Sequence, residues 1–105
     1  MAINDIKLID LRPGMEHIKL KLKIVKIIGQ RQIKTYSGLN HLILEGEVTD
    51  DSNNIPFAVW NETISLFDKI QSGDWIEISD CFVTSFKGIL QINIGRDSTI
   101  KKVGV

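Results

Sequence analysis

The sequence predicts an all-β fold, a five-stranded Greek-key barrel with one short helix between the third and fourth strands. Three observations lead to this prediction. Apolar and polar residues alternate with the period of a half-buried strand in several parts of the chain. Clusters of turn residues divide these parts into five segments. One stretch has helical spacing instead, and it lies between the third and fourth segments.

The first expected strand begins with strict alternation from Ile18 to Ile24, which puts lysines on one face and aliphatic side chains on the other. Adjacent apolar residues at Ile24-Val25 and Ile27-Ile28 then interrupt the alternation, and Gly29 is a further candidate bend. Such interruptions predict β-bulges or strong coiling, as expected where one long strand bends around a barrel.

The second and third strands are expected to form a hairpin. Residues 34–38 form a turn-like stretch, and residues 39–48 after it are predicted to be the second strand. The run from Asp50 to Asn54 is a concentrated turn signal. Residues 55–60 are therefore expected to pair with the second strand as the third.

Residues 61–71 are the predicted helix. Asn61 is expected to cap its first turn, Glu62 suits its positive end, and Gly73 is placed to end it. Three apolar residues are spaced three apart and are expected to face the core together: Ile64, Phe67 and Ile70.

The fourth and fifth strands are predicted at residues 75–86 and 89–94, joined by a tight turn at Lys87-Gly88. In the last of them Gln91 and Asn93 are expected to point away from the core. Three strands, a helix and two strands is the order of the OB-fold, whereas an SH3-like barrel does not usually place a helix there. We therefore expect residues 1–105 to form a single OB-fold domain.

Length and composition narrow the class of protein. The chain has 105 residues, 43% hydrophobic and 25% charged, as is typical of a soluble globular domain. No apolar run approaches the roughly 20 residues that span a bilayer, so no membrane partner is expected. The N-terminus lacks the features of a secretory signal, and the lone Cys81 cannot form an internal disulfide. A cytoplasmic location is expected.

Charge is balanced overall but unevenly distributed. The chain has 13 basic and 13 acidic residues, which argues against a general polyanion binder. The first 34 residues carry eight basic and three acidic side chains, and residues 35–80 carry Lys69 alone against nine carboxylates. The remainder is basic again. This pattern allows a basic face, and an ordinary solvated surface is the alternative.

No catalytic or metal site is predicted. His17 and His41 have no cysteine near them in the sequence, and Asp50-Asp51 fits an ordinary turn. A phosphate-binding glycine loop and a nucleophile-elbow serine are both missing from the sequence. We expect a binding protein without cofactor or metal, and not an enzyme.

Trp60 is the first candidate binding residue. Ile55, Phe57 and Val59 share the expected core face of the third strand, so Trp60 is expected on the opposite, outer face. On an OB barrel the outer face of the second and third strands binds nucleic acid, and each base stacked on an aromatic contributes about 1–3 kcal/mol. Alternatively, Trp60 folds over the helix that follows and closes one end of the barrel.

Phe82 and Phe86 lie on one face near the end of the fourth strand. Unbroken alternation from the start of that strand would bury both. A bulge near Asp80-Cys81 would instead turn them outward and place Val83 inside, and the pattern alone leaves both arrangements open. Lys87 follows directly and would form an aromatic and cationic tip on a loop that commonly contacts ligands in OB-folds.

Four segments, residues 11–15, 31–35, 55–60 and 82–88, together resemble the opening turn, first loop, third strand and final hairpin of a known group. These are the short single-OB single-stranded DNA-binding proteins of archaea and their human relatives, which are related to replication protein A. The resemblance covers nearly the whole chain, and by position it implies base stacking on Trp60, Phe82 and Phe86.

The chain departs from this group in two places. Phe82 stands where the group often has Trp or Tyr, which keeps the stacking surface but loses a polar group. Members also usually continue into a flexible, often acidic tail that recruits partners. Either this protein lacks the tail or these residues are one domain of a longer protein.

The resulting hypothesis is a largely sequence-independent single-stranded DNA-binding protein, nucleoid-associated and acting in replication or repair with other proteins of those pathways. About 4–6 nucleotides would cross one face, with Arg31, Lys34 and Lys87 on phosphates. Two alternatives remain, an RNA-binding OB module and an OB domain that docks a protein partner.

Overall fold

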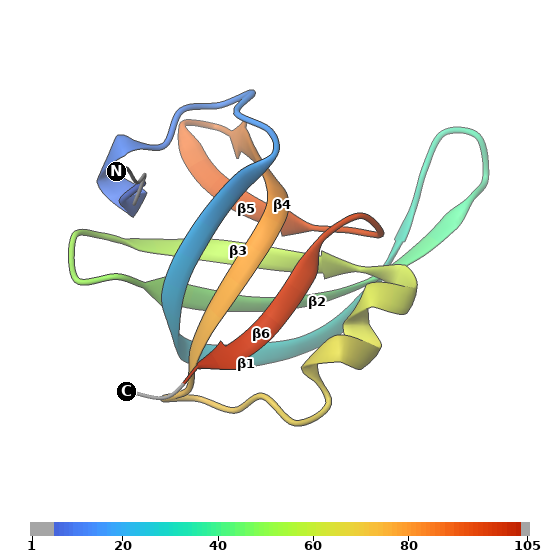
Figure 1. Cartoon of the computed structure of the whole chain (residues 1–105). Helices are drawn as coiled ribbons and strands as arrows, with labels where there is room; N and C mark the ends of the chain where they lie inside the picture. The colour runs from blue at the N-terminus through green and yellow to red at the C-terminus, as the bar shows by residue number, and fades with distance from the viewer. Residues whose placement is uncertain (1–5, 104–105) are drawn as a thin grey trace.

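The computed structural model describes residues 6–103. Residues 1–5 and 104–105 of the predicted single domain lie outside the described residues. The prediction that the N-terminus carries no secretory signal concerns, in part, these first residues. Two short 3-10 helices, η1 (Leu8–Asp10) and η2 (Asn61–Phe67), accompany the strands (Figure 1). None of the helices between residues 6 and 103 is long and apolar enough to cross a membrane. The strands are β1 (Ile18–Lys34), β2 (Asn40–Thr49), β3 (Asn54–Trp60), β4 (Trp75–Phe86), β5 (Ile89–Ile94) and β6 (Thr99–Val103).

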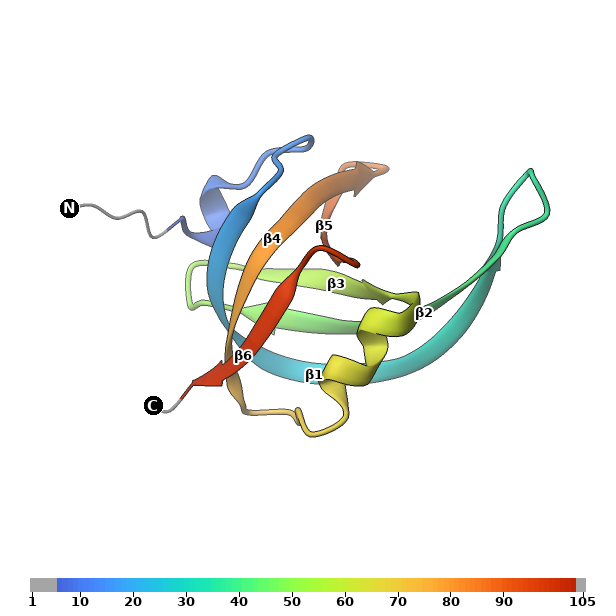
Figure 2. The ribbon, with the colours of Figure 1, turned by 45° about the vertical axis from the view of Figure 1, so that its right-hand side comes forward.

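The first five strands form a ring. They pair in the order β1-β2-β3-β5-β4, and β1 also pairs with β4. The β3–β5 pair is parallel and the other pairs of the ring are antiparallel. This is the predicted order of strands, with η2 between the third and fourth (Figure 2). β6 was not expected, and it extends the sheet by pairing with β4.

The two predicted interruptions in β1 are present. Its register against β2 shifts between Ile24 and Lys26 and again between Ile27 and Gly29. Bulges bend a strand and increase its twist. The first part of β1 can therefore pair with β4 while the rest pairs with β2, which closes the ring.

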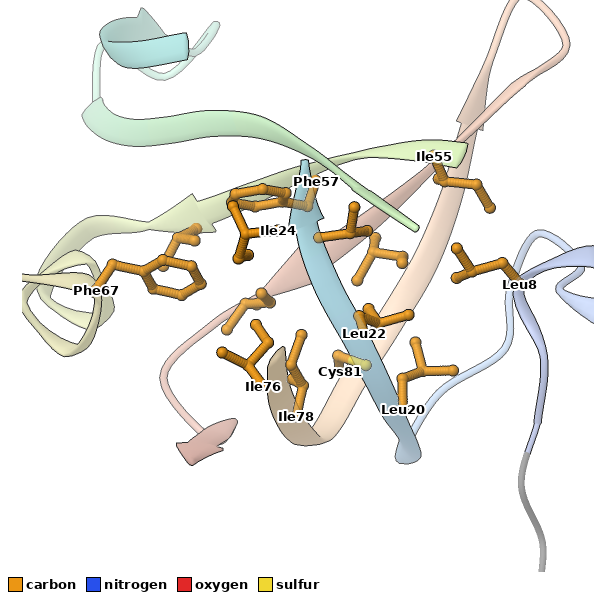
Figure 3. Close-up of a cluster of buried hydrophobic side chains, with 14 of the residues drawn as sticks. Leu8, Leu20, Leu22, Ile24, Ile55, Phe57, Phe67, Ile76, Ile78 and Cys81 are labelled. Carbon is orange, nitrogen blue, oxygen red and sulfur yellow. The ribbon is translucent and has the colours of Figure 1, made fainter. Parts of the chain in front are cut away.

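The core lies inside the ring (Figure 3). Alternate residues of β1 and β4 are fully buried there, among them Leu22 and Ile76. Phe57 of β3 stacks on Phe67 of η2, with ring centroids 5.6 Å apart. A Cβ at Gly46 would lie 2.6 Å from the Phe57 ring, so only glycine fits beside this aromatic pair.

The predicted helix is shorter than expected and is a 3-10 helix. It ends at Phe67, although Ile64 and Ile70 are buried as predicted. The expected N-cap at Asn61 was wrong. Asn61 has a positive φ of 53°, and its Oδ1 accepts a hydrogen bond from the Leu42 amide at 3.0 Å. Because β3 runs into η2 without a loop, this residue makes the turn, and Asn tolerates the left-handed conformation.

Candidate nucleic-acid interface

A bulge in β4 turns Phe82 and Phe86 outward. Ile18 of β1 pairs with Cys81 while Leu20 pairs with Ile78, so β4 holds one extra residue in this interval. Within it Asp80 has a positive φ of 59°. After the bulge Cys81 is fully buried, whereas Phe82 is 40% and Phe86 74% exposed. Of the two arrangements that the sequence left open, the outward one is present.

Strand register brings three aromatic residues to one face of the ring. Across the sheet Ala58 of β3 pairs with Asn93 of β5, which pairs with Phe82 of β4. Residues paired in this way point to the same side of a sheet. Trp60, two residues beyond Ala58, therefore shares a face with Phe82 and with Phe86, four residues further along β4. We call this the aromatic face.

Trp60, one of the three residues of the aromatic face, is partly buried. Its indole Nε1 donates a hydrogen bond to Asn93 Oδ1 at 3.1 Å. The ring also meets the His41 ring edge to face, with centroids 5.6 Å apart. Trp60 therefore lies on the outer side of the ring, as predicted, because Asn93, the residue of β5 that accepts its hydrogen bond, also points outward.

Asn93 connects several side chains at the centre of this face. Its Oδ1 also accepts a hydrogen bond from Gln91 Nε2 at 3.0 Å, and its Nδ2 donates to Thr84 Oγ1 at 2.9 Å. The alternation correctly placed Asn93 away from the core but did not predict that neighbouring side chains bury it to 2% exposure. No sequence signal points to its contact with Trp60, which depends on the parallel pairing of β3 with β5.

Lys87 and Phe86 form the predicted tip between β4 and β5. Lys87 Nζ lies 5.3 Å from the centroid of the Phe86 ring, a cation–π geometry. Lys87 and Gly88 both have positive φ, 53° and 82°, as in the two-residue turns that suit hairpins. Ile89, which pairs with Phe86, is 62% exposed and adds an apolar surface that the sequence argument did not include.

Arg31 lies on the side of Trp60 but is held by an acidic neighbour. Arg31 and Trp60 both pair with Ile43, so all three share one face. The Arg31 guanidinium donates two hydrogen bonds to Glu45, at 3.1 and 2.9 Å. These bonds and the charge of Glu45 raise the pKa of Arg31. A phosphate at this position would share the guanidinium with Glu45.

Lys34 is not brought together with the other predicted residues. Its neighbour Ile33 pairs with His41, whose ring contacts Trp60. Because successive residues of a strand point to opposite faces, Lys34 points to the other side of the β1–β2 hairpin. It is exposed at the end of β1, opposite Asn40.

Tyr36 was missed as a candidate. It is fully exposed in the turn between β1 and β2, and this hairpin projects away from the ring (Figures 1 and 2). An aromatic residue between turn-forming neighbours, Thr35 and Ser37, was the available signal.

No family model matches the chain. Among curated proteins it is 28% identical over 91 residues to the single-stranded DNA binding protein Ssb of Saccharolobus solfataricus. The match covers 87% of this chain and 59% of Ssb, so the chain spans about three fifths of that relative. Because this relative is named as a single-stranded DNA binding protein, the match supports the resemblance inferred from the sequence.

Two solved structures establish the fold. The replication factor A related protein of Methanobacterium thermoautotrophicum has a TM-score of 0.80 and 24% identity, covering 95% of this chain and 91% of that one. The OB domain of Ta0387 from Thermoplasma acidophilum has a TM-score of 0.75 and 21% identity, covering 95% and 87%. The predicted OB-fold is confirmed, as is the resemblance to proteins related to replication protein A.

Proposed function

We propose that this protein binds single-stranded DNA, with bases stacked on the aromatic face and little preference for sequence. The observation that carries the proposal is the outward position of Phe82 and Phe86 after the β4 bulge, on the same face as Trp60. Each stacked base is worth about 1–3 kcal/mol, and any base can stack. The relative Ssb is named for the same activity.

Stacking supplies most of the affinity in this proposal, and charge supplies a smaller part. The chain has no net charge, and Arg31 is engaged by Glu45. With Arg31, Lys34 and Lys87 on phosphates, the logarithm of affinity should fall with the logarithm of salt at a slope of about −2, since single strands contribute about −0.7 per contact. Lys34 reaches the strand only if the strand bends around the β1–β2 hairpin.

The proposal extends to the biological setting. Residues 1–105 act as one binding domain, without catalytic activity, near the chromosome, in replication or repair together with proteins of those pathways. DNA is preferred over RNA, and a matched pair of DNA and RNA oligomers tests this, because the 2′-hydroxyl is the group that distinguishes them. Equal affinities would favour an RNA-binding module.

The rival function is a protein-interaction OB domain that uses the aromatic face as a docking surface. Replacing both Arg31 and Lys87 with Gln separates the two functions. The double variant should bind oligonucleotides more weakly and with a shallower salt slope if phosphates lie beside the aromatic residues. If the face docks a hydrophobic protein partner instead, the same double variant should still bind that partner.

The central experiment is a titration with oligothymidine, followed by tryptophan fluorescence at low and at raised salt. The chain has two tryptophans, Trp60 and Trp75. We expect strong quenching that Trp60→Ala removes and Trp75→Phe retains, and a loss of affinity of about 10- to 100-fold in Trp60→Ala. A flat signal at low salt, together with unchanged electrophoretic mobility, would exclude the proposed function.

A further inference from the structure

Asn93 is the most buried polar residue of the aromatic face. It is 2% exposed, although its side chain points to the outer side of the ring between Ala58 of β3 and Phe82 of β4. An asparagine amide has two donor hydrogens and an oxygen that can accept two hydrogen bonds. Both places on the Asn93 oxygen are taken by Trp60 Nε1 and Gln91 Nε2. One donor hydrogen is taken by Thr84 Oγ1.

The register explains how Trp60 reaches this amide. Asn93 pairs with Ala58, which precedes Trp60 by two residues on the same face. Since alanine has only a methyl group, the indole of Trp60 can lie back across β3 toward β5. Its Nε1 then comes within 3.1 Å of Asn93 Oδ1.

Two contacts therefore determine how the indole ring lies. Asn93 holds its N–H, and the His41 ring meets it at an interplanar angle of 74°. A ring that is already ordered loses less side-chain freedom when a base stacks on it. The indole N–H is also satisfied within the protein, so a stacked base meets the ring surface of Trp60 without an unpaired donor that would select among bases.

We infer that Asn93 is a positioning residue for DNA binding, which orients the stacking surface of Trp60 through the hydrogen bond to its indole N–H; this inference rests on the proposed function. It assigns a role to a residue that does not itself contact the strand. Asn93→Leu removes the acceptor and keeps the branched shape of the side chain. We expect it to weaken oligothymidine binding about 3- to 10-fold, the cost of ordering one large side chain.

The test uses the Trp75→Phe background, in which Trp60 is the single tryptophan. Asn93→Leu should shift the Trp60 emission maximum and increase its quenching by acrylamide, together with the loss of affinity. Thr84→Val is the matched control. It removes a different partner of Asn93 and leaves the Trp60 bond in place, so Trp60 emission should stay as in the parent.

A double-mutant cycle with Trp60→Phe separates positioning from general packing. Phe keeps a stacking ring and lacks the N–H, so Asn93→Leu should have little further effect on affinity in this background. An undiminished effect there, or parent-like affinity and emission in Asn93→Leu, would overturn the inference. A parent protein that does not bind oligothymidine would instead overturn the proposed function.

A measurement on the unsubstituted protein covers the case in which Asn93→Leu does not fold. The Trp60 indole proton should exchange slowly with solvent by nuclear magnetic resonance, because it is hydrogen-bonded to a buried amide. Thr84→Val should preserve this slow exchange. Rapid exchange of that proton in the folded protein would contradict the inference.

Discussion

The ring has two contrasting outer faces that share strand β4. The aromatic face carries Trp60, Phe82 and Phe86. The second, which we call the lysine face, lies across β1, β4 and β6 and carries Lys19, Lys21, Lys23 and Lys101 around Glu77 and the partly buried Trp75. Before the bulge at Asp80 the odd-numbered residues of β4 point outward, and after it Phe82, Thr84 and Phe86 do. Because of this one extra residue, β4 contributes Glu77 to the lysine face and Phe82 and Phe86 to the aromatic face.

Positive charge and stacking surface are separated between these faces. On the lysine face Lys21 and Lys101 both pair with Glu77 across the strands, and Lys19 Nζ lies 3.7 Å from its carboxylate. On the aromatic face the Arg31 charge is met by Glu45. The balanced net charge of the chain therefore does not argue against binding of a strand by stacking.

Asp80→Val should have the largest effect, because a β-branched residue strongly disfavours the positive φ of 59° at the bulge in β4. If β4 lost the bulge and kept all its residues, its alternation would be unbroken, which would direct Phe82 and Phe86 toward the core and Cys81 outward. We expect loss of oligothymidine binding and a marked loss of thermal stability, measured by fluorescence anisotropy and circular dichroism.

Asp80→Gly is the matched control for this substitution, because glycine accepts the positive φ. It should fold and bind, and its Cys81 should resist alkylation near pH 8, since burial raises the pKa of that thiol to about 12. In Asp80→Val, Cys81 should be alkylated rapidly. Equal binding by the two variants would show that the positive φ at Asp80 does not control which face carries Phe82 and Phe86.

Phe86→Ala should have the next largest effect on binding. Its ring is 74% exposed, so its removal should change the free energy of unfolding by only about 0.5 kcal/mol. We expect oligothymidine affinity to fall about tenfold, the loss of one stacked base. Calorimetric titration with thermal denaturation separates the two quantities. Unchanged affinity would mean that the strand does not extend to the β4–β5 turn.

Glu45→Gln should strengthen binding at low salt by about threefold. The substitution releases the Arg31 guanidinium and removes a negative charge from the aromatic face. The gain should disappear at high salt and in the Arg31→Gln, Glu45→Gln double variant. Anisotropy titrations at several salt concentrations measure both. An affinity that does not respond would place the phosphates away from Arg31.

Replacing Lys19, Lys21 and Lys23 together with Gln should have the smallest effect, less than about twofold at physiological salt. These lysines lie on the other outer face of the ring. The same titration should show a salt slope close to that of the parent. A steep loss of affinity would mean that the strand also follows the lysine face, and the contrast between the faces would not hold.

Much of the fold could be predicted because its signals are local. Alternation located the strands of the ring, and adjacent apolar pairs located both bulges of β1. The Lys87-Gly88 turn also lay where its residues indicated. The helix was predicted in the right place but with the wrong type and cap, because its first residue has a long-range role in holding Leu42.

The sequence by itself determined the OB order of strands and the identity of the three aromatic residues that could stack bases. Only the tertiary structure decided which way Phe82 and Phe86 point, because that depends on a positive φ at Asp80 and on pairing with β1. It also decided that Arg31 meets Glu45 and that Trp60 meets Asn93, 33 residues away. The physical reason is that alternation records which side of its own strand a residue takes, whereas contacts across the face depend on how the ring closes.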